Sequence, residues 1–258
     1  MRGADLQAAV TASFESIETS PWLGGSRVSS RHNYVAFMAA KAACSTIKLA
    51  LHHFETPDVE VEHWWDIHFL HPAPSLADYS PDEVVHMLSS DNWFRFCVVR
   101  NPYDRLVSAW KQKLVSDNDP GYAWLREEIR SAFGTGVDCA IPFRDSVEYL
   151  AANEAMARDA HWMPMWSTMR PDIVAYDVVG RFEHFQSDFA DILRQLGAPR
   201  EVESMAAMIT NATPTIPLNA LYDSELANRV YSHYEADFTA FDYAKDSWLG
   251  VTTTGGER

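Results

Sequence analysis

A buried strand followed at once by a helix occurs twice in the first half of the chain, and this constrains the fold more than any other feature. Residues 33–40 are nearly all apolar, and from Cys44 the apolar residues recur at helical spacing. Residues 94–99 repeat the pattern, and Pro102 suits the first position of a following helix. Parallel strands need such crossover connections. We therefore expect an α/β protein with a P-loop-like three-layer fold, in which helices flank a central, mainly parallel sheet.

The rest of the chain predicts further helices and one more strand. A capping box over Ser80–Glu83 predicts a helix that starts at Pro81. A short run of mostly apolar residues predicts a third strand over 173–179, and a helix that ends at Gly197 is expected to follow it. We expect other helices within 6–17, from 122 to the stop at Gly134, over 147–157, and over 224–241, so that the C-terminal part is helical.

Charge and cysteine content limit the classes of function. The 258 residues include 36 acids and 21 bases, a formal net charge of −15, which opposes non-specific attraction to nucleic acid or an anionic membrane. The three cysteines have no metal-ligand spacing, and free thiols indicate a reducing compartment. No secretory signal and no apolar run of about 18 residues is visible. We expect a cytoplasmic protein with no membrane span, no metal and no nucleic-acid partner, and its first helix allows a homodimer.

The segment K-A-A-C-S-T-I-K, residues 41–48, has the physical properties of a phosphate-binding loop. Its small side chains let backbone N–H groups turn toward a ligand, and the following helix offers its positive end to an anion. Ser45 and Thr46 add hydroxyl donors, and Lys41 adds a mobile positive charge. The segment lacks the glycines of a Walker motif. Taken alone, it is better explained as a helix start with two solvated lysines.

A second segment, residues 98–110 (V-V-R-N-P-Y-D-R-L-V-S-A-W), strengthens the case for an anion site. Arg100 stands at the carboxyl end of a predicted strand, where α/β proteins place ligands. Ser108 follows eight residues later, about two helical turns along. An arginine and a hydroxyl can converge on one phosphate, or Arg100 can form a salt bridge and Ser108 can pack. For Arg105 we expect a structural role, with Asp104 within reach.

Together the two segments resemble the nucleotide-binding signatures of carbohydrate sulfotransferases that sulfate chondroitin, dermatan and the natural-killer-cell epitope, with their bacterial relatives. The resemblance continues in order at 161–165 (H-W-M-P-M), 177–185 (D-V-V-G-R-F-E-H-F) and 233–243 (H-Y-E-A-D-F-T-A-F-D-Y). In that family the first segment holds the 5′-phosphosulfate of 3′-phosphoadenosine 5′-phosphosulfate (PAPS), and the second holds its 3′-phosphate. The resemblance implies transfer of a sulfuryl group from PAPS to a hydroxyl of a carbohydrate or other small acceptor.

The resemblance also implies residue roles. Lys41 is expected to stabilise charge on the leaving group, and Arg100 and Ser108 to bind the 3′-phosphate. Arg181 is expected either to touch the nucleotide or to pair with Glu183. The donor-binding loop is expected to comprise Lys41, Ala42, Ala43, Cys44, Ser45, Thr46, Ile47 and Lys48. The chain departs from the family at Ala40, Ala43 and Ile47, where proline, glycine and tryptophan are usual, and residues 211–219 contain no Lys or Arg.

In-line sulfuryl transfer needs a base for the acceptor hydroxyl, and histidine suits that role near neutral pH. Residues 63–72 contain three histidines, where family members often keep one. We favour His68, then His71, as the catalytic base. Asp66 and Glu62 are acidic alternatives, and His161 either faces the acceptor or braces the fold. A sugar-stacking platform, if present, would come from Trp64, Trp65, Trp162 and Trp166.

We expect one sulfotransferase domain over 31–248, preceded by an N-terminal helix and linker over 1–30 and followed by a flexible tail over 249–258. Two alternatives stay open. One is a P-loop nucleotide kinase-like phosphotransferase, against which the missing Walker glycines count. The other is a non-catalytic member of the same family that binds only a nucleotide.

Overall fold

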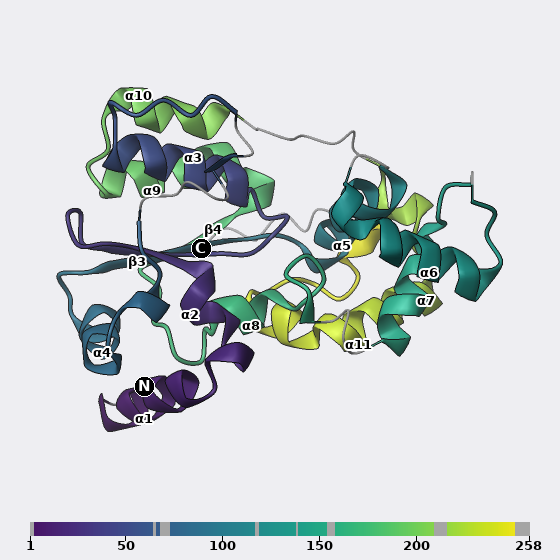
Figure 1. Ribbon diagram of the computed structural model, residues 1–258, viewed down its shortest axis with the longest axis horizontal. Helices are drawn as coiled ribbons and strands as arrows, with labels where there is room; N and C mark the ends of the chain where they lie inside the picture. Colours follow the sequence, from purple (N-terminus) through teal and green to yellow (C-terminus); the bar gives the residue numbers. More distant parts are fainter. Residues whose placement is uncertain are drawn as a thin grey trace. The chain divides into compact units, whose positions relative to one another are not determined.

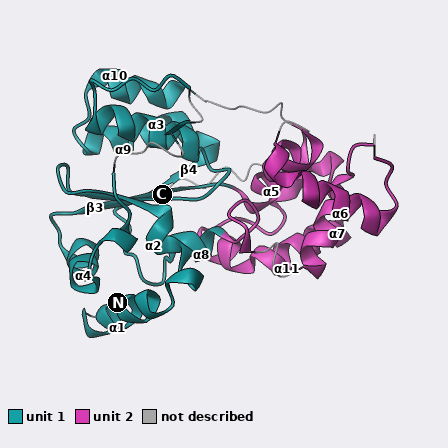
Figure 2. Ribbon diagram, viewed as in Figure 1, with its two compact units in different colours: residues 1–100, 165–212 teal, residues 101–164, 213–258 magenta. Residues whose placement is uncertain are grey.

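The computed structural model describes residues 3–63, 66–67, 73–116, 119–137, 139–153, 158–208 and 216–250. The chain divides into two compact units (Figure 2). The first unit comprises residues 1–100 and 165–212, and the second comprises 101–164 and 213–258. The expected domain limits at 31 and 248 stay a prediction. His68, His71, Trp64 and Trp65 lie outside the described residues.

The first unit contains a four-stranded sheet of order β1-β2-β3-β4. Its strands are β1 (Ser26–Ser29), β2 (Tyr34–Met38), β3 (Phe94–Val99) and β4 (Val178–Arg181). The pairs β2–β3 and β3–β4 are parallel, and β1 is antiparallel to β2. The mainly parallel sheet is therefore confirmed.

Two strands differ from expectation. β1 falls in a segment expected to be a linker, because four residues with only one large apolar side chain give a weak strand pattern. The strand expected over 173–179 instead spans Val178–Arg181. Ile173 and Val174 are buried, but they lie in and just after a turn in which both N–H groups donate to the carbonyl of Arg170.

Helices cover both faces of the sheet (Figure 1). On one face, α3 (Cys44–Glu55), α9 (Phe185–Gln195) and α10 (Arg200–Glu203) pack over every second residue of β2, beginning with Tyr34. On the other face, α2 (Pro21–Gly25) and α8 (Met165–Met169) contact β2, and Trp22 stacks on Phe37. Below them, α1 (Gly3–Glu15) contacts α4 (Pro81–Ser89). The three-layer α/β architecture is confirmed.

The second unit is helical in its described part. It contains α5 (Pro102–Trp110), which continues as a π-helical turn over Lys111–Val115, and α6 (Ala123–Phe133), α7 (Phe143–Ala152) and α11 (Ser224–Ala240). The predicted stop at Gly134 is confirmed, with φ of 68°. The helix expected over 147–157 begins earlier, at Phe143. The helical C-terminal part is likewise confirmed.

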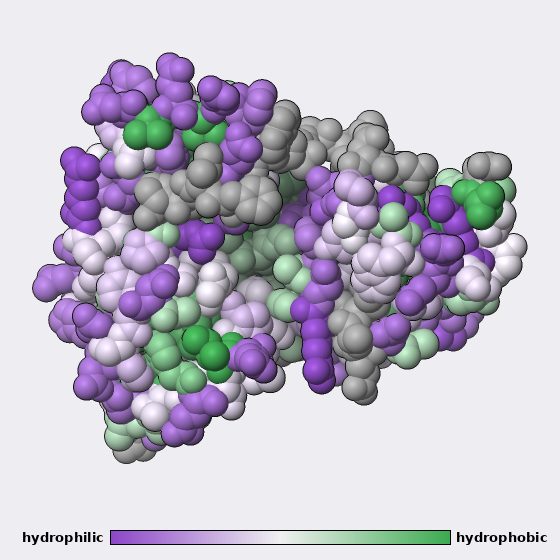
Figure 3. Space-filling model, in the orientation of Figure 1, coloured by the Kyte–Doolittle hydropathy of each residue, from purple (hydrophilic) through white to green (hydrophobic). Residues whose placement is uncertain are grey.

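On the face drawn in Figure 3, hydrophobic residues show as small separate groups among hydrophilic ones. Within the described ranges, no helix combines the length and apolar character that crossing a membrane requires. The three cysteines, Cys44, Cys97 and Cys139, are free thiols.

An ion pair ties β3 to the start of β4. The guanidinium of Arg95 donates from Nε to Asp177 Oδ2 at 2.9 Å and from Nη2 to Oδ1 at 3.1 Å, and its backbone N–H donates to Oδ2 at 2.7 Å. Nη1 of the same guanidinium donates to the carbonyl of Leu88 in α4. Partial burial raises the pKa of Asp177, but the hydrogen bonds from Arg95 outweigh it and hold this pKa below its usual value.

Replacing this carboxylate tests its contribution. Asp177→Asn should lower the free energy of unfolding at pH 7 by about 2 kcal/mol, less than the loss of a fully buried partner because Asp177 is partly exposed. A depressed folded-state pKa gives stability above the unfolded pKa of about 3.9, which is lost as pH falls through the folded value. In denaturant titrations between pH 7 and pH 3, the free energy of unfolding of the variant should therefore fall less with acidification than that of the wild type. Asp172→Asn, which breaks the more exposed pair with Arg170, is the control and should change stability by less than about 1 kcal/mol.

Candidate functional site

The loop between β2 and α3 has an unusual backbone. Lys41 and Ala43 have φ angles of 70° and 59°, in the left-handed region that side chains with a Cβ disfavour. Ala43 is also the residue that caps α3, and alanine has no side-chain acceptor for the N–H groups of the first turn. Such a loop is strained in the way that ligand-binding turns often are, and it directs the positive end of α3 toward the end of β2.

The residues that follow divide between the loop and the core. Cys44, Ser45 and Lys48 are half-buried, whereas Thr46 and Ile47 are each only 1% exposed. The side chain of Ile47 packs in the core between α3 and the sheet, and its N–H donates to the carbonyl of Ala43. Only the first three residues of α3 therefore present N–H groups in the orientation that suits an anion.

Arg100 lies beside this loop. It follows β3 directly, and its Nη1 donates to the carbonyl oxygen of Lys41 at 2.8 Å. Its Cζ lies 4.0 Å from the ring centroid of Phe182, a cation–π contact that fixes the plane of the guanidinium. The structure thus brings together the lysine of the first predicted segment and the arginine of the second.

Arg181 adds a third cation to the same edge of the sheet. It is the last residue of β4, pairs with Val99 of β3, and donates its backbone N–H to Asp188 at 2.8 Å. Lys41, Arg100 and Arg181 therefore come at or just after the carboxyl ends of three adjacent parallel strands. That edge is where open α/β sheets bind their ligands.

Two predicted residues of the second segment lie in the second unit. Ser108 is buried in α5, 5% exposed, and its action together with Arg100 stays a prediction. Arg105 is 2% exposed and donates to the carbonyls of Met163 at 2.8 Å and Ala160 at 3.2 Å. These bonds hold the backbone of residues 160–163 in place, which is a structural role of the kind expected for Arg105.

His161 of the H-W-M-P-M segment belongs to a polar cluster in the second unit. Its Nδ1 lies 3.0 Å from Asp159 Oδ1 and 2.7 Å from Tyr122 Oη, and Tyr122 donates to Asp159 Oδ2 at 2.9 Å. A proton on Nδ1 gives each of these contacts a hydrogen. Burial raises the pKa of Asp159, but hydrogen bonds from His161 outweigh this and lower it. The cluster braces the segment that carries His161.

The tryptophans of the predicted sugar platform are not alike. Trp162 is fully buried and its carbonyl accepts from Tyr234, so it belongs to the core and the expectation of a sugar-facing role was wrong for it. Trp166 is half-buried, with the Arg170 guanidinium 5.0 Å from its ring. Within the described residues, no group of three His, Cys, Asp or Glu side chains could hold a metal ion.

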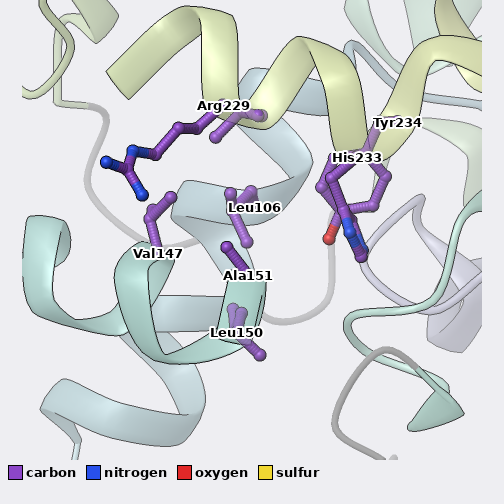
Figure 4. A pocket seen from close by; sticks show the side chains of 8 residues that line it. Leu106, Val147, Leu150, Ala151, Arg229, His233 and Tyr234 are labelled. Carbon is purple, nitrogen blue, oxygen red and sulfur yellow. The ribbon is translucent and has the colours of Figure 1, made fainter. Parts of the chain in front are cut away.

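A small apolar hollow in the second unit is a poor substrate site. Leu106, Val147, Leu150 and Ala151 line it, with Arg229, Val230, His233 and Tyr234 from α11 (Figure 4). Its cavity volume of about 20 Å³ holds one water molecule. Neither a nucleotide nor a sugar fits there.

Sequence reasoning missed two residues near the loop. Phe182 supports Arg100, and the only sequence signal is its place just after a strand parallel to β3. Arg27 lies in β1 opposite Ala36 of β2, two residues before the end of β2. Its segment was expected to be a linker, so Arg27 was not predicted to lie near the loop.

Comparison with known proteins now identifies the family. A sequence model described as the sulfotransferase family matches residues 25–244, a span that includes all five segments quoted above. The chain belongs to the sulfotransferase family. The sequence-based expectation of that family is confirmed, and the matched span includes β1, the strand that holds Arg27.

The curated relatives of this sulfotransferase-family chain carry related names. It is 28% identical over 231 residues to human carbohydrate sulfotransferase 14, covering 84% of this chain and 59% of that protein. It is 26% identical over 238 residues to mouse carbohydrate sulfotransferase 8 (84% and 56%) and 29% identical over 196 residues to zebrafish carbohydrate sulfotransferase 10 (68% and 53%). The chain thus spans about half to three-fifths of each relative's length. No solved structure matches it.

The loop strain at Ala43 has a measurable consequence. Ala43→Gly should raise the free energy of unfolding by about 0.5–1 kcal/mol, because glycine adopts a positive φ without a Cβ clash. Ala42→Gly, one residue earlier at an ordinary φ and buried, should lower it by about 1 kcal/mol. Denaturant unfolding of the two variants measures both changes. An equal loss in both would show that the backbone at Ala43 is not strained.

Proposed function

We propose that this protein transfers a sulfuryl group from PAPS to a hydroxyl of a carbohydrate or other small acceptor. The observation that carries the proposal is the bond between Arg100 and the Lys41 carbonyl, which joins the two phosphate-binding segments in a member of the sulfotransferase family. The names of the curated relatives support a carbohydrate as the acceptor. A cytoplasmic place of action and a homodimer stay part of the proposal.

The residues present fit a donor with several anionic groups. The strained loop and the first turn of α3 offer N–H groups to a 5′-phosphate, with Ser45 and Thr46 as hydroxyl donors. Arg100, whose guanidinium carries five N–H donors, suits a 3′-phosphate, and Ser108 is its proposed partner. Arg181 adds positive charge at the same edge of the sheet. In this assignment Ala42 and Ile47 support the loop by packing.

We assign the steps of an in-line transfer to individual side chains of this protein. The proposed base, His68 or else His71, takes the proton from the acceptor hydroxyl as its oxygen forms a bond to sulfur. Lys41 stabilises the negative charge that develops on the 5′-phosphate oxygen as the bond from sulfur to that oxygen breaks with its electron pair. The products are a sulfate ester and adenosine 3′,5′-bisphosphate. Nothing in this sequence of steps needs a metal ion.

Binding of adenosine 3′,5′-bisphosphate by titration calorimetry tests the nucleotide site. Lys41→Ala and Arg100→Ala should each weaken binding by about 10- to 100-fold, because each removes a charge-assisted hydrogen bond worth about 1.5–3 kcal/mol. Arg194→Ala is the matched control, since Arg194 is an exposed arginine of α9 that pairs with Asp191. It should leave the affinity unchanged. A folded wild-type protein that does not bind the bisphosphate would sink the proposal.

Turnover tests the base and the reaction class. His68→Ala should lower kcat by about 10²- to 10⁴-fold while bisphosphate binding persists, as loss of a general base requires. His86→Ala, on the exposed face of α4, should change neither. A chelator should leave sulfuryl transfer unaffected, whereas a kinase-like phosphotransferase would need magnesium. Tight bisphosphate binding without transfer to any carbohydrate acceptor would instead indicate a non-catalytic nucleotide-binding protein.

A further inference from the structure

Arg27 is a half-buried cation on β1, the strand at one edge of the sheet. It lies opposite Ala36 in the antiparallel pair of β1 and β2, and directly opposed side chains lie on the same face of a sheet. Ala36 belongs to the core that α3 covers. The Arg27 side chain therefore lies on the α3 face, close to the carboxyl end of β2.

The described residues satisfy one nitrogen of this guanidinium and leave another, which is buried, without a partner. Nη1 donates to the carbonyls of Ser26 at 2.6 Å and Gly24 at 3.3 Å. Nε is buried, and the described residues offer it no hydrogen-bond partner. A buried donor without a partner is costly and calls for an explanation.

No carboxylate of the described chain neutralises Arg27 directly. The negative charge of Asp78 reaches it, but the two form no ion pair within 4.0 Å, and the Asp78 carboxylate accepts from the backbone and hydroxyl of Ser75. Burial, the larger effect, lowers the pKa of Arg27. The chain has 36 acidic residues, yet none of the described ones forms an ion pair with this half-buried arginine.

A second cation on α3, Lys48, lies within the electrostatic reach of Arg27. Lys48 lies one helical turn after Cys44 and is half-buried. Burial lowers the pKa of Lys48, the Cys44 thiol raises it, and the charge of Arg27 lowers it further. Two like charges that influence each other under partial burial repel, and an anion bound by both relieves that repulsion.

The strand order indicates which anion this is. If the 5′-phosphate lies at the loop after β2 and the 3′-phosphate at Arg100 after β3, the nucleotide extends from β2 toward β3. Its sulfuryl end then points the other way, toward β1 and Arg27. We infer that Arg27 and Lys48 form an anion subsite for the sulfuryl group of the donor, which distinguishes the donor from the desulfated product. This inference rests on the proposed function.

Comparing two ligands tests the subsite. Arg27→Met keeps the length of the side chain but removes its charge, so it should weaken PAPS binding, measured without acceptor, by about tenfold while bisphosphate affinity stays within about twofold. Arg31→Met is the matched control, because Arg31 lies in the turn after β1, where it donates to the carbonyl of Glu55. It should change neither affinity. Lys48→Met should show the same selective loss, and it carries the comparison if Arg27→Met does not fold.

The outcomes separate this inference from the proposed function. If the wild type binds neither ligand, the proposed function fails and the subsite with it. If the wild type binds both but Arg27→Met and Lys48→Met keep the ratio of the two affinities, the subsite alone is overturned. An effect confined to KM for acidic acceptors would assign the two cations to the acceptor and would also overturn it.

Discussion

The parallel register of β2, β3 and β4 decides where the cations of the candidate site lie. Parallel strands finish at one edge of a sheet, so residues about 60 and 140 positions apart come to the same place. Lys41, Arg100 and Arg181 follow or end these three strands. The Arg95–Asp177 pair helps to set the register of β3 against β4, and so it supports the site from the opposite end of the strands.

The loop and Arg100 depend on each other. Arg100 uses the carbonyl of Lys41, and that carbonyl is oriented by the left-handed conformation of Lys41. Phe182 from the end of β4 holds the guanidinium from its other side. A residue held by a backbone carbonyl and an aromatic ring loses little additional freedom when it binds a ligand, which is the advantage of preorganisation. The cost is a strained loop, and residues with unfavourable φ angles commonly cluster at functional sites.

Most of the sheet and the position of the loop between β2 and α3 could be predicted from the sequence because their signals are local. Residues 34–40 form a continuous apolar run, residues 94–99 form one that only Arg95 interrupts, and the small residues from Ala42 to Thr46 follow the first of them. β1 could not be found in this way, since an edge strand of four residues has too short a pattern. The strand near 173 was misplaced because Ile173 and Val174 are buried in and beside a turn, and burial alone does not distinguish a turn from a strand.

The contacts within the site were beyond sequence reasoning for a different reason. Arg100 and Phe182 are 82 positions apart, and the charge of Arg27 reaches Lys48 because β1 pairs with β2 and α3 covers one face of that sheet. The net charge of −15 does not bear on these contacts, because it describes only the far field. At physiological salt that field is screened within about 8 Å. An anion that reaches the loop therefore responds to the nearby cations, and three of these, Lys41, Arg100 and Arg181, come at or just after the carboxyl ends of β2, β3 and β4. Local geometry, rather than total charge, decides which anions this protein can hold.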